Sequence, residues 1–270
     1  MSLAAGPEDY FTSCGQKGLP LDECLVVDAH GHLGPLCDFP QTDGSVSGLI
    51  EVMDRIGIDR IYVSGGPGLF GQAAIGNDIV REAMRLHPDR IFGYMMVDVE
   101  QPETILAEMN RRFEEGFIGV KIWSRGTREG PSYTHPGYEV VFDFAQANAL
   151  PVLAHTWGDE LDQLDPSFRK YGNIKWLLAH SGSVQVEKYI HFAKTYENVY
   201  LETCLSACPR GLIEKFVREL PLHKIIWGTD QMFMSATHQL GRVLFARITP
   251  EQKQAILGAN AAAVLPGRRK

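Results

Sequence analysis

The chain has 270 residues, of which 44% are hydrophobic and 22% are charged, an ordinary composition for a globular protein with a large apolar core. A formal net charge of -7 argues against a nucleic acid or an anionic membrane surface as a partner held by bulk charge attraction. No apolar run approaches the ~20 residues that span a bilayer, which argues against a membrane-spanning helix.

Residues 1–23 are expected to be a loose N-terminal lead-in, because they are polar and contain glycine. They lack the basic region and the apolar core of a secretory signal. The 5 cysteines have no paired spacing, so they are most simply reduced thiols. These observations predict a cytoplasmic protein. The composition shows no linker-like change, which predicts that residues 24–270 form one domain.

The first predicted strand leads directly into two histidines. Leu25, Val26 and Val27 form an apolar run, which is the signal of a buried strand. His30 and His32 follow two positions apart, so on an extended chain their imidazoles point to the same side. Two such imidazoles can bind a divalent metal ion, although the pair alone is equally consistent with histidines that bind nothing.

Further helices and strands alternate along the chain. Apolar residues at helical spacing predict helices at 46–56, 75–86, 103–115, 138–148, 184–195, 210–219 and 250–265. Short apolar runs predict strands at 60–64, 91–97, 117–123, 151–155, 175–180, 199–202 and 224–227. About eight strand-then-helix units favour an α/β protein with the single-domain (β/α)8 TIM-barrel fold. The alternative, a doubly wound open sheet, usually has a glycine fingerprint after its first strand, where this chain has histidines.

In such a barrel the functional groups lie at the carboxyl ends of the strands. Besides the first pair, His155, His180 and Asp230 follow predicted strands at that position. Metal-binding side chains from several strands would therefore converge on one mouth, which chance placement would not produce. The remaining histidines lack that position, and we interpret them as structural or surface groups: His87, His135, His191, His223 and His238.

This ordered set resembles the amidohydrolase superfamily, specifically its amidohydrolase-related branch of metal-dependent TIM-barrel hydrolases and decarboxylases. Val27-Asp-Ala-His-Gly-His32 is similar to the first-strand motif of that branch. The motifs of its fifth, sixth and eighth strands resemble Val152-Leu-Ala-His155, Leu178-Ala-His180-Ser-Gly and Trp227-Gly-Thr-Asp230. Residues 257–265 resemble its closing helix, so the matches cover nearly the whole chain.

The resemblance implies a role for each of these residues. The implied metal ligands are His30, His32, His155 and Asp230. Asp230 would accept a proton from water, and His180 would carry a proton, polarise the substrate or bind a second metal. Neutral imidazoles with a carboxylate suit Zn²⁺ as the cofactor, or Mn²⁺, Fe²⁺ or Co²⁺ where availability decides.

Lys121 has two interpretations. In other branches of the superfamily a carboxylated lysine on the fourth strand bridges two metals, and Lys121 stands on the corresponding predicted strand, 117–123. Its alternative role is a partly buried ammonium group paired with an acid. The sequence leaves the choice between one metal and two open.

Substrate contacts are expected from residues that follow the strands. Trp123 and Trp157 would line an apolar or aromatic pocket, although buried packing fits them equally well. Arg125 and Arg210 would bind a substrate carboxylate bidentately, or remain solvated surface charges. Cys204 also follows a strand, but no neighbouring base marks it as a nucleophile.

The residues and the resemblance together predict a metal-dependent hydrolase that cleaves an amide, lactone or ester of a small, carboxylate-bearing substrate with metal-activated water. A non-oxidative decarboxylase of an aromatic or unsaturated acid is the alternative, because it uses the same metal site. A non-catalytic scaffold barrel would not need such a set of imidazoles at one rim. The expected partner is a small-molecule substrate, with no nucleic acid and no membrane, and a homodimer is left open.

Overall fold

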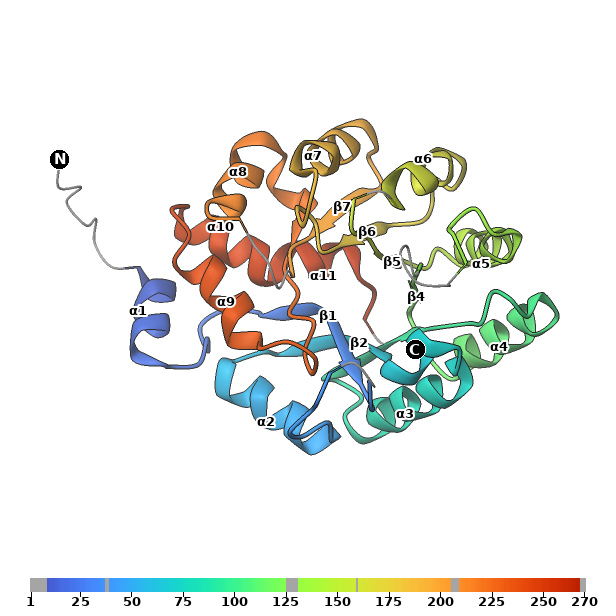
Figure 1. Cartoon of the computed structure of the whole chain (residues 1–270). Coiled ribbons are helices and arrows are strands. Elements are labelled where there is room, and N and C mark those ends of the chain that lie inside the picture. Colours follow the sequence, from blue (N-terminus) through green and yellow to red (C-terminus); the bar gives the residue numbers. More distant parts are fainter. Residues whose placement is uncertain (1–8, 37–38, 125–130, 159, 205–208, 268–270) are drawn as a thin grey trace.

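Eight parallel strands, hydrogen-bonded in sequence order, form a nearly closed barrel in this computed structural model, which describes residues 9–36, 39–124, 131–158, 160–204 and 209–267 (Figure 1). The strands are β1 (Val27–Leu33), β2 (Arg60–Gly65), β3 (Ile91–Met95), β4 (Gly119–Ile122), β5 (Val152–His155), β6 (Trp176–Ala179), β7 (Val199–Glu202) and β8 (Ile225–Ile226).

A helix follows nearly every strand. The α-helices are α1 (Tyr10–Lys17), α2 (Val46–Ile56), α3 (Ala73–Leu86), α4 (Pro102–Glu114), α5 (Pro136–Ala147), α6 (Glu160–Lys170), α7 (Val186–Thr195), α8 (Leu212–Glu219), α9 (Ala236–Leu244), α10 (Pro250–Gln254) and α11 (Asn260–Val264). The shorter segments are η1 (Gly66–Phe70), η2 (Leu222–Lys224) and η3 (Ala255–Ala259), of which η3 is a π-helical turn between α10 and α11. Among the described residues, no helix has the length and apolar character needed to cross a bilayer.

The barrel closes where the segment after β8 meets β1. The backbone N–H of Ala29 donates to the carbonyl of Trp227 at 3.1 Å, and the N–H of Asp230 donates to the carbonyl of His30 at 2.7 Å. The consecutive strand order has no switch point, so the doubly wound alternative is wrong and the predicted (β/α)8 barrel is confirmed. Closure also brings the predicted site residues of the first and last strands together.

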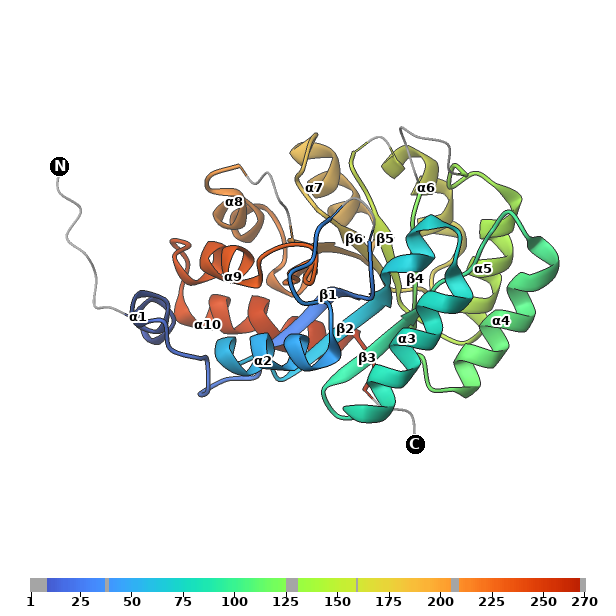
Figure 2. The ribbon, with the colours of Figure 1, turned by 60° about the horizontal axis from the view of Figure 1, so that its bottom comes forward.

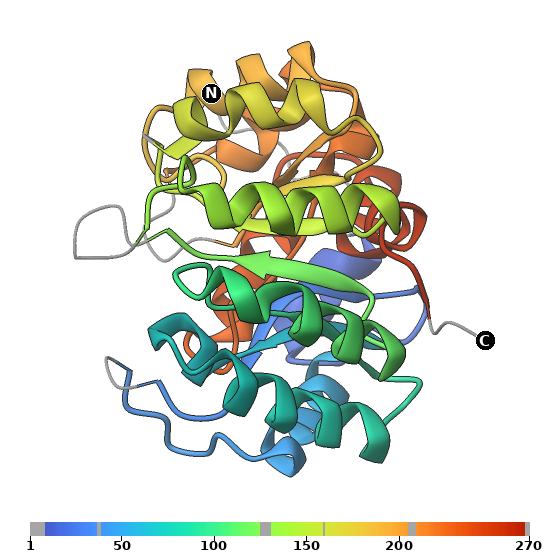
Figure 3. The same cartoon turned by 90° about the vertical axis from the view of Figure 1, so that its right-hand side faces the viewer.

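Apolar side chains fill the barrel, and a second apolar layer packs between the strands and the outer helices. Figure 3 shows these helices along the outside of the strands. The interior cluster includes Val27, Tyr94 and Leu153 from the strands. Ala261 and Leu265 from the carboxyl-terminal segment join it, so this segment covers the end at which the strands begin. The opposite end, where the strands finish, is left for polar side chains.

Residues 9–23, which we expected to be loose, contain the helix α1. Asp9 caps this helix, and Phe11 and Cys14 are buried. Lys253 on α10 donates to the carboxylate of Asp9 at 2.7 Å. The helix is therefore fixed beside α9 and α10, as Figure 2 shows, by contacts that no local sequence pattern indicates.

Two further helices, α6 and α9, complete the alternation and were not predicted. Helix α6 contains Pro166, and an Asp-Pro pair is typical of a turn. Its residues Leu161, Leu164 and Phe168 are nevertheless buried at helical spacing. Packing of this apolar face therefore outweighs the backbone hydrogen bond that the proline removes.

Arg112 is a buried charge that joins α3 to α4. Its guanidinium, 0% exposed, donates to Asp78, Glu108 and Glu115 at 2.6–2.8 Å. Because these carboxylates are partly exposed, Arg112→Ala should lower the free energy of unfolding by about 2–3 kcal/mol, less than for a fully buried pair. Urea denaturation measures this loss, with Arg111→Ala on the exposed face as a control expected to cost below about 1 kcal/mol. If Arg112→Ala and Arg111→Ala lowered the free energy of unfolding equally, the burial of the Arg112 guanidinium would not be the cause of the loss.

Candidate metal centre

Three donor atoms meet at the mouth of the barrel. Nε2 of His30 lies 3.1 Å from Nε2 of His32. Oδ1 of Asp230 lies 3.0 Å from Nε2 of His32 and 3.6 Å from Nε2 of His30. Both imidazoles are buried. Two ring nitrogens and a carboxylate oxygen at this separation suit a divalent cation.

The backbone is irregular where it carries these donors. The pairing of β1 with β2 shifts register between Asp28 and Gly31, so the strand bulges at the position of His30. Asp230 and His180 both have φ of 60°, in the left-handed region. Residues other than glycine seldom adopt that region, and those that do cluster at functional sites.

Hydrogen bonds hold the other ring nitrogen of each histidine. Oε2 of Glu202 lies 3.0 Å from Nδ1 of His30, and Oγ of Ser64 lies 3.0 Å from Nδ1 of His32. A proton on Nδ1 of each ring satisfies both partners and leaves Nε2 unprotonated, as a metal ligand requires. Metal-ligating histidines in proteins are usually held in this way.

Burial sets the protonation states. It lowers the pKa of all four strand-end histidines (His30, His32, His155 and His180), which are therefore neutral, the form that binds metals. Burial alone would raise the pKa of Asp230, but the hydrogen bond from His32 and the neighbouring His30 hold it below its ordinary value. An ionised carboxylate therefore faces two neutral imidazoles.

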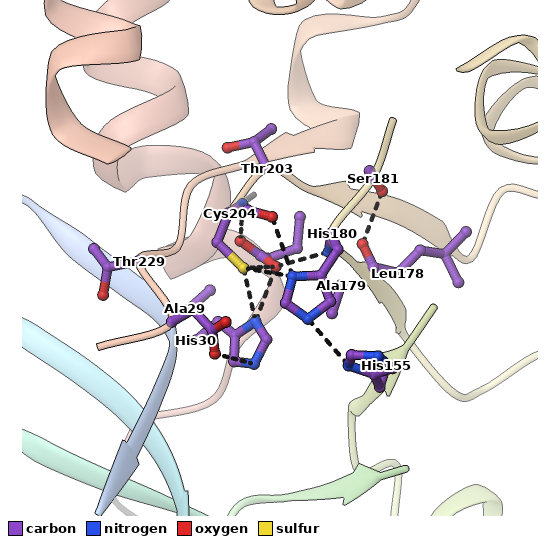
Figure 4. A network of polar contacts seen from close by, with 12 residues as sticks. Ala29, His30, His155, Leu178, Ala179, His180, Ser181, Thr203, Cys204 and Thr229 are labelled. Carbon is purple, nitrogen blue, oxygen red and sulfur yellow. Dashed lines mark hydrogen bonds and ion pairs between the residues drawn. The ribbon is translucent and has the colours of Figure 1, made fainter. Parts of the chain in front are cut away.

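His155 and His180 reach the same mouth from β5 and β6. Nδ1 of His155 lies 3.0 Å from Nε2 of His180 (Figure 4), and the rings of His180 and His30 are 5.2 Å apart between centroids. Among the described residues, His30, His32 and Asp230 form a compact donor group, and His155 is linked to that group through His180.

Lys121 points into this cluster from β4. Its Nζ lies 2.8 Å from Nε2 of His30 and is buried, and burial lowers the pKa of the ammonium to about 8. The sequence analysis offered pairing with an acid as the alternative role, but the hydrogen bond of Lys121 goes to an imidazole. The amine is therefore a further polar group at the cation site.

The sequence analysis missed Glu202 and Ser64. Both hold a histidine of the site, and neither is of a residue type or spacing that marks a metal site by itself. The available signal was position, because the predicted strands 60–64 and 199–202 end at these residues. The site histidines of the other strands also lie at strand ends.

Trp123 and Trp157 border the mouth of the barrel. The rings of Trp123 and His155 are 4.0 Å apart between centroids, and those of Trp157 and His180 are 5.8 Å apart. Trp157 is 40% exposed, which suits a residue at the rim rather than one packed in the core.

A cavity of about 160 Å³ adjoins Lys121, and its lining residues follow β2, β3 and β4. They include Phe70, Met96, Asp98, Glu100 and Trp123. A larger cavity of about 740 Å³ lies between α1, α2 and α9, and no strand-end histidine is among the described lining residues of either cavity. Arg210 lines a separate cavity beside α8 and α9, and Arg125 lies outside the described residues.

Replacing Ser64 with alanine should weaken binding of a divalent metal by about 10- to 100-fold, because the ring of His32 loses the partner that orients it. Ser181 is a matched control, since it is also buried but donates to the carbonyl of Leu178 at 2.8 Å. Ser181→Ala should leave the metal dissociation constant unchanged in a competition titration. If the two substitutions weakened binding equally, the hydrogen bond to His32 would not be the cause.

A comparison of the sequence with protein-family models identifies the family of the chain. The sequence model of a protein family described as "Amidohydrolase" matches residues 27–267. No curated protein matches the chain in sequence.

Solved structures with the same fold are distant in sequence. The 5-carboxyvanillate decarboxylase LigW from Sphingomonas paucimobilis is 15% identical, with 90% of this chain and 99% of that chain covered and a TM-score of 0.70. A dihydroxybenzoic acid decarboxylase from Polaromonas with bound manganese is 17% identical, with 89% and 96% covered and a TM-score of 0.70. A probable 2-pyrone-4,6-dicarboxylic acid hydrolase from Acinetobacter baumannii is 16% identical, with 88% and 98% covered and a TM-score of 0.65.

Proposed function

The chain belongs to the amidohydrolase family, and from that membership we propose that it is a metal-dependent hydrolase of a small amide, lactone or ester. One observation carries the proposal: the ionised carboxylate of Asp230 lies within 3.0–3.6 Å of the Nε2 atoms of His32 and His30. A carboxylate that is already ionised is ready to accept a proton from water, as hydrolysis requires, rather than to donate one.

The donor set fits a divalent cation. His30, His32 and Asp230 would hold it, and His155 would complete the set after turning away from His180. Zn²⁺ suits these ligands, and Mn²⁺ is the second candidate because the Polaromonas decarboxylase contains it. When bound, the cation would supply Lewis acidity that polarises water and the scissile carbonyl group.

Asp230 and His180 would each carry out one of the two proton transfers. Asp230 would accept the proton of the attacking water. His180 would donate a proton to the leaving group, because its ring stands between His155 and the backbone carbonyl of Cys204, which lies 3.3 Å from Nδ1. Lys121 would add a hydrogen bond near the cation, and its role as a bridge to a second metal stays a prediction.

The cavity beside Lys121 indicates what the substrate looks like. Phe70, Met96 and Trp123 provide apolar and aromatic walls, which suit a planar body such as one aromatic or unsaturated ring. The expectation that the substrate carries a carboxylate now rests on Arg125, which lies outside the described residues, because Arg210 lines a different cavity.

Decarboxylation of an aromatic acid is the second candidate. The aromatic cavity wall favours it, and so do the decarboxylases among the structures that share the fold. In that reaction the metal site would hold the substrate, and a proton would replace carbon dioxide on the ring.

A product assay in water enriched in heavy oxygen separates the two reactions. The metal-loaded protein would be incubated with small aromatic lactones, esters and amides and with a series of hydroxybenzoates. Hydrolysis places heavy oxygen in the product acid and releases no carbon dioxide. Carbon dioxide release without incorporation of heavy oxygen would replace the proposal with decarboxylation, and the absence of both reactions across the panel would contradict the two together.

A further inference from the structure

A second set of donor atoms lies behind His30, on the side of the ring that faces away from Asp230. Sγ of Cys204 lies 3.1 Å from Nδ1 of His30 and 3.3 Å from Nδ1 of His180. It also lies 3.0 Å from Oε2 of Glu202, which in turn is 3.0 Å from Nδ1 of His30. Figure 4 shows the sulfur beside both imidazoles, with a dashed line to each.

One donor atom each from His30, His180 and Cys204 lies within 4.8 Å of the other two, and Oε2 of Glu202 adjoins two of them. His30, Glu202 and Cys204 are each 0% exposed, and His180 is 5% exposed. In tetrahedral zinc sites with nitrogen, oxygen and sulfur ligands, neighbouring donors are about 3.3–3.5 Å apart, as the metal–ligand bond lengths require. The sulfur lies 3.0–3.3 Å from its three neighbouring donor atoms, so these pairs would need to separate by only a few tenths of an ångström.

We propose that Cys204, His180, Glu202 and His30 form a second cation site, which takes a thiophilic divalent ion such as Zn²⁺ or Cd²⁺. A sulfur ligand distinguishes this site from the first site, whose donor atoms are nitrogen and oxygen. The thiolate is the form of cysteine that ligates a metal, so a bound cation displaces the proton of the Cys204 thiol. Binding therefore releases two protons to solvent, the thiol proton of Cys204 and the Nδ1 proton of His30, as the bonds from sulfur and Nδ1 to the cation form.

Occupation of this site has a consequence for the first. The ring of His30 would bridge two cations through its two nitrogens, and Nδ1 of His180 would no longer be free to move a proton. We therefore expect excess Zn²⁺ to inhibit whichever reaction the first site supports. The binding itself does not depend on that reaction being hydrolysis.

Cobalt titration tests the proposal without a substrate. Chelator-treated protein is titrated with Co²⁺, which gives a sulfur-to-cobalt charge-transfer band in the near ultraviolet only when a thiolate binds it. The wild-type chain should take up a second equivalent of Co²⁺ and develop this band. Cys204→Ser should lose both while still binding the first equivalent, and Cys14→Ser, which removes a buried thiol in α1, should keep both.

Two further measurements separate failure of the second cation site from failure of the proposed hydrolase and from misfolding of a variant. Asp230→Asn should weaken the first site and retain the sulfur band, so failure of the proposed hydrolase and failure of this inference are distinguishable. X-ray absorption of the Cd²⁺-loaded wild-type protein should show a sulfur neighbour, which covers the case in which Cys204→Ser does not fold. A single equivalent bound by the wild-type chain with no sulfur band, or a band that persists in Cys204→Ser, would overturn the proposal.

Discussion

Replacing Asp230 with asparagine should lower kcat by about a thousandfold for any substrate that the chain turns over. The amide keeps the size of the side chain but removes the charge and the ability to accept a proton from water. Because Oδ1 also lies 3.0 Å from Nε2 of His32, the substitution should weaken metal binding as well. Steady-state kinetics at saturating metal separate the two effects, since added metal restores binding but not the proton acceptor.

Asp54 offers a control for this experiment. It lies on the outer helix α2, 59% exposed, and forms an ion pair with Arg90 at 2.9 Å. Asp54→Asn should leave kcat unchanged. If Asp230→Asn retained the rate of the wild-type protein with metal bound, the carboxylate would have no part in the chemistry.

Replacing His32 with asparagine should remove bound metal from the purified protein. The amide cannot place a nitrogen where Nε2 of the imidazole stands, 3.0 Å from Asp230. The loss of metal affinity should exceed the about 10- to 100-fold that removal of a supporting hydrogen bond costs. Elemental analysis after dialysis measures the metal, and thermal unfolding gives a second readout because a bound metal stabilises only the folded state.

His135 provides a matched histidine control. It caps the amino end of α5 by accepting a hydrogen bond from the N–H of Gly137 at 3.1 Å, and asparagine is itself a good residue at this position. His135→Asn should therefore keep the metal and its stabilising effect. Equal metal content in His32→Asn and the wild-type protein would place the ion elsewhere.

The barrel and the mouth could be predicted because both follow from local rules. Apolar runs of strand length alternate with helical spacing, and the strand ends of a closed parallel barrel must meet. His30, His32, His155, His180 and Asp230 stand at those ends in the sequence, and the structure brings them to one mouth.

Features that depend on tertiary contacts could not be predicted. Helix α1 is short, and its order comes from Lys253 and α9, which lie far along the chain. Helix α6 forms in spite of Pro166 because its apolar face is buried. The bulge of β1 at His30 is visible only in the pairing of β1 with β2, and the sequence analysis assumed a regular strand there.

Side-chain orientation limited the prediction of the site. The sequence analysis treated His155 as equivalent to His30 and His32, but its Nδ1 hydrogen-bonds to His180 instead. No sequence feature marks Glu202 as a site residue, but in the structure its carboxylate contacts the ring of His30. The cytoplasmic location and the homodimer stay predictions.

Crystals soaked in Mn²⁺ provide the most direct test of the central claim, that His30, His32 and Asp230 bind one divalent cation. Anomalous diffraction locates the ion without reference to any substrate. The account predicts a peak about 2.0–2.3 Å from Nε2 of both histidines and from Oδ1 of Asp230, as metal–ligand bond lengths require. Fully loaded crystals with no peak between these atoms, or with a peak bound elsewhere on the chain, would contradict it.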